Sequence, residues 1–217
     1  MKKIAVLLSG SGVFDGSEIH EAVLTMLALT KLGASYQCFA PDIEQMHVVN
    51  HLTGEVAAEE SRNVLVESAR IARGEITATD RLDIDAFDAL VIPGGFGAAK
   101  NLCNFATNGS DCEISLEVSD FISEFADAKK PVGFICIAPV MIPLLYGEGV
   151  TGTIGNDIDT AQAFNLMGGH HQEAAVQDII VDEANKVVST PAYMLAGNIA
   201  EANEGIEKLV KKVLEMV

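Results

Sequence analysis

One cysteine lies where it could act as a nucleophile. Cys136 follows the apolar run 132–135 and comes just before Ala138-Pro139, and proline in a first helical turn is a helix-start signal. At such a strand-to-helix elbow, the dipole of the helix N-terminus stabilises a thiolate and lowers the thiol pKa. A lone cysteine in an apolar run is more often a packing residue. The elbow position shifts the balance toward reactivity.

A second candidate is the acid Glu18, in the glycine-rich segment 9-SGSGVFDGSEIHEA-22. Asp15 and Glu18 have the spacing of a capping box, so Glu18 could simply cap a helix. It could equally supply a carboxyl group to a site. The glycines do not match the GxGxxG spacing, and no phosphate-loop signature is present, so we expect no nucleotide.

Two further loops could complete a site. Gly94 and Gly95 follow the apolar run ALVI, and without side chains their backbone N–H groups could approach an anion or a developing oxyanion. A plain tight turn is the alternative. The polar loop 153-TIGNDIDTAQ-162 could deliver Asn156 or Asp157 to the same crevice, or it could cap a helix through Asp157 or Asp159.

The remaining cysteines and the histidines do not predict a metal or a cofactor. The four cysteines show no CxxC spacing, which favours free thiols in a reducing compartment over a disulfide framework. Cys103 and Cys112 could pair only if the fold brings them together. Neither the pair His47 and His51 nor the adjacent pair 170–171 has the spacing of a zinc site.

The elements that would position these residues alternate along the chain. Short apolar runs are separated by longer amphipathic ones, which predicts βαβ units around a mainly parallel sheet. We expect strands at 3–9, 35–40, 89–95, 132–137 and 151–154, with a hairpin within 178–191. We expect helices at 18–33, 61–74, 114–130, 138–145, 159–169 and 198–216. Residues 1–217 should form one domain, with its site beyond the carboxyl ends of the central strands.

Composition excludes several classes of partner. The formal charge of −17, from 31 acidic against 14 basic residues, argues against nucleic acid and against anionic membrane surfaces. No run approaches the roughly 18 apolar residues that span a bilayer. The apolar run at the N-terminus is short and is better explained as a first strand than as a signal peptide, so a cytoplasmic protein is expected.

Several longer motifs resemble the ElbB family, the enhancing-lycopene-biosynthesis or sigma cross-reacting proteins of the DJ/PfpI superfamily. The motifs that carry the resemblance are DGSEIHEA, NHLTGE, ARGEI, PGGFGAAKNL, GFICIAP, TIGNDIDTA and STPAYM. The resemblance covers essentially the whole chain. It implies a flavodoxin-like three-layer α/β sandwich of the class I glutamine amidotransferase-like type, and a homodimer.

The resemblance also implies roles for individual residues. Cys136 would be the nucleophile, and Glu18 the buried acid that hydrogen-bonds its thiol. The oxyanion would be bound by the backbone N–H groups of Gly95 and Ile137, with Gly94 and Asn156 as further binding residues. No metal and no cofactor are implied.

Two positions differ from the sequence pattern of the superfamily, and they bear on which catalytic activity is expected. Ile137 stands where many PfpI-type members have a histidine, and no His-x-Glu pair follows residue 171. A Cys-His-acid triad for amidotransferase or peptidase work is therefore poorly supported. The resemblance implies an activity that a two-residue site can support, since similar proteins are glutathione-independent glyoxalases, hydro-lyases acting on glyoxal or methylglyoxal. The alternative is a redox or stress-responsive binding protein, linked only indirectly to isoprenoid biosynthesis, in which Cys136 is reversibly oxidised.

Overall fold

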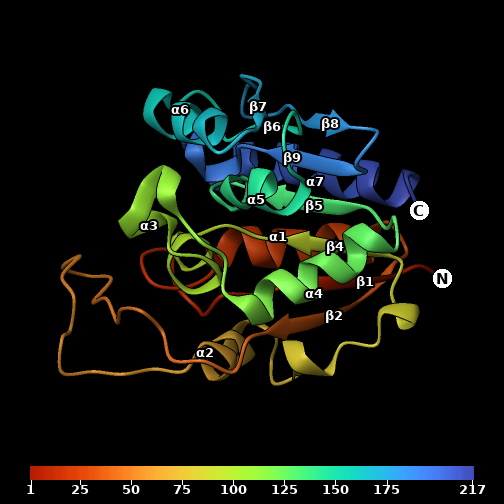
Figure 1. The fold of residues 1–217 in the computed structure, drawn as a ribbon. Helices are drawn as coiled ribbons and strands as arrows, with labels where there is room; N and C mark the ends of the chain where they lie inside the picture. Colours follow the sequence, from red (N-terminus) through yellow and green to blue (C-terminus); the bar gives the residue numbers. More distant parts are fainter.

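Seven strands form one central sheet in the computed structural model, which describes residues 1–217 (Figure 1). The sheet order is β3-β2-β1-β4-β5-β9-β8. The strands are β1 (Lys3–Leu7), β2 (Ser35–Ala40), β3 (Ile76–Ala78), β4 (Ala89–Ile92), β5 (Val132–Ile135), β8 (Ile180–Asp182) and β9 (Val187–Thr190). All neighbours are parallel except β8 and β9, which form the expected antiparallel hairpin.

Helices cover both faces of this sheet and complete three layers. One face carries α1 (Ile19–Lys31), α2 (Val64–Ile71) and α7 (Ile199–Glu215). The other carries α4 (Leu116–Asp127) and α5 (Ile142–Tyr146) (Figure 1). The short helices α3 (Phe105–Asn108) and α6 (Ile158–Leu166) and a two-stranded sheet of β6 (Thr151–Gly152) and β7 (His170–His171) lie outside these layers. The predicted flavodoxin-like sandwich with a C-terminal hairpin and helix is confirmed.

The central strands are apolar throughout because both of their faces are buried. In β1, Ile4 and Val6 pack in the layer of α1 and α7, whereas Ala5 and Leu7 pack in the layer of α4 and α5. Successive side chains of a strand point to opposite faces, so each strand contributes to both cores. This packing fixes the carboxyl ends of β4 and β5 side by side.

Some boundaries differ from the sequence-based expectation. The strand β3 and the β6–β7 pair are only two or three residues long, too short to produce a clear alternation of apolar residues. The expected helix 138–145 divides into a 3₁₀ turn (Ala138–Met141) and α5, with prolines near the start of each. None of the helices is long and apolar enough to cross a membrane.

Candidate active site

Cys136 lies at the predicted elbow. It follows β5 directly, its backbone N–H donates to the carbonyl oxygen of Thr190 at 2.9 Å, and Pro139 lies in the 3₁₀ turn that follows. Its φ of 64° is a left-handed conformation that costs a non-glycine residue of order 1–2 kcal/mol. Strain of this kind persists where the surrounding structure enforces it, and it collects at functional sites.

The carboxyl group that faces the Cys136 thiol belongs to Glu21. Glu21 lies in the first turn of α1 and is completely buried. One carboxyl oxygen accepts a hydrogen bond from the N–H of Gly94 at 2.9 Å, and the other accepts one from the N–H of Tyr193 at 3.2 Å. The side chain also interacts with the thiol of Cys136. Ala192, just before Tyr193, has a φ of 42°, so a second strained residue supports this contact.

Burial dominates the electrostatics of this pair. It raises the pKa of Glu21 from 4.5 to about 8, against the lowering effect of the two backbone N–H groups. Glu21 is therefore neutral at pH 7. Burial, followed by repulsion from an ionised Glu21, also raises the pKa of the Cys136 thiol, while the backbone N–H groups of Gly95 and Ile137 lower it. Because each charge disfavours the other, the pair gives up one proton far more easily than two.

The role predicted for Glu18 is corrected by this geometry. Glu18 is the N-cap of α1, and its carboxylate accepts a hydrogen bond from the N–H of Glu21 at 2.7 Å. Glu18 therefore does cap the helix, but as the N-cap residue itself rather than as the third residue of a capping box begun by Asp15. The buried partner of the thiol lies one helical turn further on. A signal for Glu21 was present in the sequence, since Glu21 shares the inward face of the helix with Thr25 and Ala28. An acidic side chain that faces the core needs a hydrogen-bond partner, because burying an unpaired polar group is costly.

The two glycines of the second loop have different tasks. The N–H of Gly94 is occupied by Glu21, so its predicted part in substrate binding is not supported. A side chain there would begin 2.5 Å from the Cβ of Cys136, which makes glycine necessary for the close approach of the two loops. The backbone N–H groups of Gly95 and Ile137 hydrogen-bond the Cys136 sulfur. Their binding of an oxyanion stays a prediction, because such donors must face the oxygen of the adduct.

Replacing Gly95 should be one of the costliest glycine substitutions in the chain. Gly95 has a φ of +92°, and an added Cβ would lie 2.3 Å from the backbone nitrogen of Glu18. We expect Gly95→Ala to destabilise the protein by at least about 3 kcal/mol in urea unfolding. Gly33→Ala is the control, because Gly33 has a φ of +75° but open space around it, so it should lose only about 1 kcal/mol. Equal losses in the two variants would contradict the close approach of the loops.

A cavity of about 390 Å³ opens over the sulfur. Its wall is built from the loops after β1, β4, β5 and β9, from α3 beyond the sheet (Figure 1) and from the start of α6. The lining residues are Val13, Glu18, Gly95, Phe96, Ala99, Phe105, Ala106, Cys136, Ile137, Thr160, Tyr193 and Met194. Glu18 thus shares the cavity with Cys136, although it is not the partner of the thiol.

Other predicted residues lie elsewhere. Asn156 is exposed and does not line the cavity, so its predicted role is wrong, and the same segment contributes Thr160 instead. Asp157 caps α6 by accepting from the N–H of Thr160 at 2.9 Å. His171 does not line the cavity, and its Nε2 accepts from the N–H of Ile154 at 3.2 Å. No histidine completes a triad with Cys136.

The other cysteines are separate from the nucleophile. Cys103 and Cys112 lie close enough to shift each other's pKa, but the thiol of Cys103 donates to the carbonyl oxygen of Ala98 at 3.3 Å and that of Cys112 to the sulfur of Met167 at 3.7 Å. Neither lines the cavity of Cys136. Cys38 is buried on β2, and burial raises its pKa to about 12. No group of three or more histidine, cysteine or acidic side chains is arranged to hold a metal ion.

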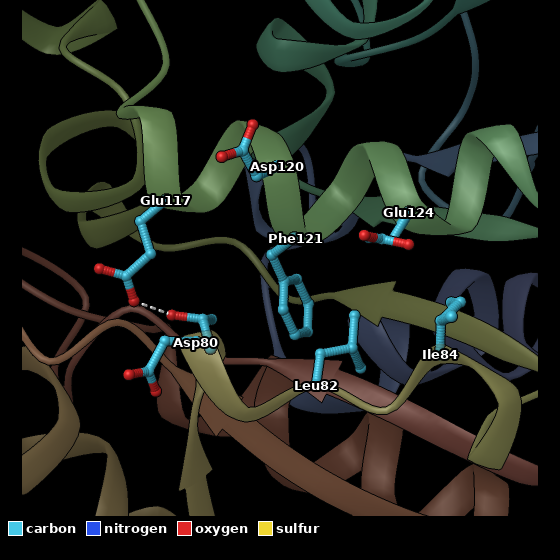
Figure 2. Close-up of a pocket in the computed structure, with 8 residues that line it drawn as sticks. Asp80, Leu82, Ile84, Glu117, Asp120, Phe121 and Glu124 are labelled. Carbon is cyan, nitrogen blue, oxygen red and sulfur yellow. Dashed lines mark hydrogen bonds between the residues drawn. The ribbon is translucent and has the colours of Figure 1, made fainter.

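A second cavity, of about 400 Å³, lies between the segment 79–84 and α4 (Figure 2). Four carboxyl groups line it, and Figure 2 shows Glu117 and Phe121 of α4 facing that segment, with Glu117 hydrogen-bonded to Thr79. The lining contains no cysteine, histidine or cation. The chemistry-bearing groups of the chain are therefore concentrated at Cys136.

Comparison with known proteins agrees with this site and fold. The chain is 46% identical to the rat ES1 protein homolog over 223 residues, which span 99% of this chain and 84% of the relative. It is 45% identical to the human glutamine amidotransferase-like class 1 domain-containing protein 3, across 99% of this chain and 83% of the relative. No protein-family model matches the chain.

Solved structures give the same picture. An isoprenoid biosynthesis protein with an amidotransferase-like domain from Ehrlichia chaffeensis superposes with a TM-score of 0.92 at 38% identity, covering 100% of this chain and 99% of that one. Glyoxalase III from Candida albicans, at 14% identity and a TM-score of 0.63 over 99% of this chain and 97% of its own, shares the fold.

The expected cytoplasmic location is contradicted by these relatives. Both the rat and the human protein are named as mitochondrial. Unpaired cysteines indicate a reducing environment, but they do not tell one reducing compartment from another.

Identity of 45–46% over nearly the whole chain, with a strand-to-helix elbow at Cys136, shows that the protein belongs to the ES1 and ElbB-like family of glutamine amidotransferase-like class 1 proteins.

Proposed function

We propose that the protein is a glutathione-independent glyoxalase that converts glyoxal or methylglyoxal to the 2-hydroxy acid. The observation that carries the proposal is the cavity itself, where a thiol, a carboxylate and two backbone N–H donors meet with no histidine. Amide hydrolysis needs a general base beside the cysteine. An internal proton shift in a dicarbonyl compound needs only a nucleophile and one carboxylate.

The reaction proceeds without an oxidant. The sulfur of Cys136 bonds to one aldehyde carbon, and the thiol proton is taken up by that aldehyde oxygen, which faces the N–H groups of Gly95 and Ile137. Glu18 removes the hydrogen of that carbon as a proton, which leaves an enediolate, and returns the proton to the neighbouring carbon. The hydroxyl proton of the first carbon passes to the oxygen of the neighbouring carbon. The product is a thioester of the 2-hydroxy acid. Water hydrolyses the thioester and restores the thiol.

In this scheme the two carboxyl groups divide the work. Glu18 lines the cavity and moves the proton, whereas the neutral Glu21 lies behind the sulfur and positions it. Glu21 is thus a positioning residue, and Glu18 is the catalytic acid-base group.

Product analysis tests this division. We expect the purified protein to form glycolate from glyoxal, and lactate from methylglyoxal, without glutathione. Glu18→Gln should lower kcat about 100-fold, because amide groups do not shuttle protons. Glu201→Gln, an acid in the first turn of α7, is the control and should keep full activity. Absence of product from the wild-type protein, or equal kcat in Glu18→Gln, would overturn the glyoxalase mechanism.

A redox or stress-responsive protein is the second candidate, and one observation favours it. A neutral Glu21 beside Cys136 can donate a hydrogen bond to an anionic cysteine sulfinate. Peroxide would oxidise the thiol first to the sulfenic and then to the sulfinic acid, releasing one water at each step. Sulfinate at Cys136 at low peroxide, without aldehyde turnover, would favour this candidate. The Ehrlichia relative is named as an isoprenoid biosynthesis protein, and we assign that link to this second candidate. The lining of the cavity has no cation that could bind the diphosphate group of an isoprenoid compound, so direct catalysis on such a compound is not proposed.

We also propose a homodimer, as the family resemblance implied. Ile19, Val23 and Leu27 form one stripe on α1, and each is more than 40% exposed. A second copy would cover this stripe. Val23→Glu should then convert the dimer into a monomer in light scattering, and a wild-type protein that is already monomeric would contradict the dimer.

A further inference from the structure

We infer that the cavity over Cys136 selects uncharged carbonyl compounds with an apolar substituent, such as an aryl or branched alkyl α-oxoaldehyde, over glyoxal and over anionic substrates. The inference rests on the proposed function and names its substrate class.

The size of the cavity is the first support. Sites of about 300 to 1,000 Å³ take drug-sized ligands. At about 390 Å³ this cavity falls in that range, whereas glyoxal has only four heavy atoms. A two-carbon substrate would leave most of the apolar wall in contact with water. A substituent the size of a phenyl ring would remove that wall from water and gain binding energy in proportion to the area covered.

The chemistry of the wall is the second support. Phe96, Phe105 and Met194 supply large apolar surfaces, and Val13 and Ile137 add to them. Phe96 is 48% exposed although the amine of Lys100 lies over its ring, 5.4 Å from the centroid, so it still offers apolar surface to a bound substituent. Aromatic rings in a concave wall favour flat apolar groups, which they contact edge-on or in offset stacks.

Charge is the third support. Glu18 is the one formally charged side chain among the lining residues, and it is acidic. The neighbouring cation Lys100 does not line the cavity, since its amine donates to the carbonyl oxygen of Phe14 at 2.8 Å. An anionic substrate would meet a carboxylate and no compensating cation in a chain of formal charge −17. Substrates with carboxylate or phosphate groups are therefore excluded.

Labelling of Cys136 tests the selectivity without depending on turnover. The probes are iodoacetamide, its N-benzyl derivative and iodoacetate, with rates followed by mass spectrometry of the Cys136 peptide and normalised to a free cysteine peptide. We expect the benzyl probe to label Cys136 about tenfold faster than iodoacetamide, because its ring is buried against the wall. Iodoacetate should be the slowest by a further factor of about ten, because of charge repulsion and desolvation. Equal normalised rates for the three probes would overturn the inference.

Variants locate the selectivity in the wall. Phe96→Ala should remove most of the benzyl preference, measured as the ratio of the benzyl rate to the iodoacetamide rate in the same variant. Phe14→Ala is the control, since Phe14 is also a partly exposed phenylalanine but lies outside the cavity, and it should keep the preference. Ala106→Arg, at an exposed lining position of α3, should raise the iodoacetate rate relative to iodoacetamide. Loss of the preference in Phe14→Ala as well, or no change in Ala106→Arg, would count against the cavity as its source.

The outcome is separable from that of the proposed function. In turnover, kcat/KM for phenylglyoxal should exceed that for glyoxal by about tenfold. Selective labelling without turnover of any aldehyde would uphold the cavity chemistry and reject the glyoxalase. Turnover with no preference in labelling or in kcat/KM would uphold the glyoxalase and reject the selectivity of the cavity.

Discussion

Glu21→Gln is expected to change the pH dependence of stability more than any other single substitution. The pKa of Glu21 is about 8 in the folded protein against 4.5 for the free side chain, so the folded state holds a proton that the unfolded state releases. Its stabilising contribution is complete below pH 4.5 and is lost as the pH rises toward 8. One pKa unit corresponds to about 1.4 kcal/mol, so the loss amounts to at most about 5 kcal/mol.

The stability curves of the glutamine variant and the wild type, plotted against pH, should therefore cross. At pH 5 we expect the variant to be less stable by about 1–3 kcal/mol, because its NH₂ group cannot accept from both Gly94 and Tyr193. Above pH 8 it should be the more stable protein, since it buries no charge. Urea unfolding at pH 5, 6, 7, 8 and 9 measures this, and the titrations of groups that do not interact with Glu21 cancel in the difference between the two proteins. If the difference in free energy of unfolding between the two proteins stays constant from pH 5 to pH 9, Glu21 is not neutral in the folded state.

Cys136→Ala is expected to remove turnover and labelling together. The mechanism has one nucleophile, and residues that act as a unit fail together, so kcat should fall by at least about a thousandfold. Cys136→Ser should be equally inactive, because a hydroxyl of similar size is a far weaker nucleophile. Folding should survive, since alanine and serine fill the same position at the elbow.

Cys38→Ala supplies the control. Cys38 is also buried, at 1% exposure, but it lies on β2 and its thiol contacts only the sulfur of Met26 at 3.8 Å. Activity and Cys136 labelling should be unchanged in this variant. Turnover that persists in Cys136→Ala would show that the cavity works through Glu18 and the backbone N–H groups alone.

The sequence determined the architecture and the position of the candidate nucleophile. Apolar runs such as 4–7 and 89–92 have few alternatives to buried parallel strands, because residues on both faces must leave water. The position of Cys136 at the end of a strand could be predicted from the sequence just as directly. A strand that runs into a proline-marked helix start has to turn sharply, and the residue at that turn is displayed. The proximity of Gly95 and Ile137 to Cys136 could be predicted from the topology, which brings the ends of β4 and β5 together.

Only the tertiary structure decided which carboxyl group serves the thiol. Glu18 and Glu21 are three residues apart in one helix, so the sequence places both near the same loop. The rotation of α1 against the sheet sends Glu21 beneath the elbow and leaves Glu18 at the cap and on the cavity wall. The buried face of α1 already indicated that Glu21 points inward, but its meeting with the elbow at Cys136 is fixed only by the packing of α1 on the sheet and α7.

The same reason explains the other misses. Gly94, Asn156 and the thiols of Cys103 and Cys112 were each placed by loops whose paths depend on distant contacts. Gly94 gives its N–H to a residue 73 positions away, and Asn156 turns to solvent while Thr160 faces the cavity. Hydrophobic patterning fixes elements and their order, but the direction of a side chain in a loop is fixed only when the elements pack.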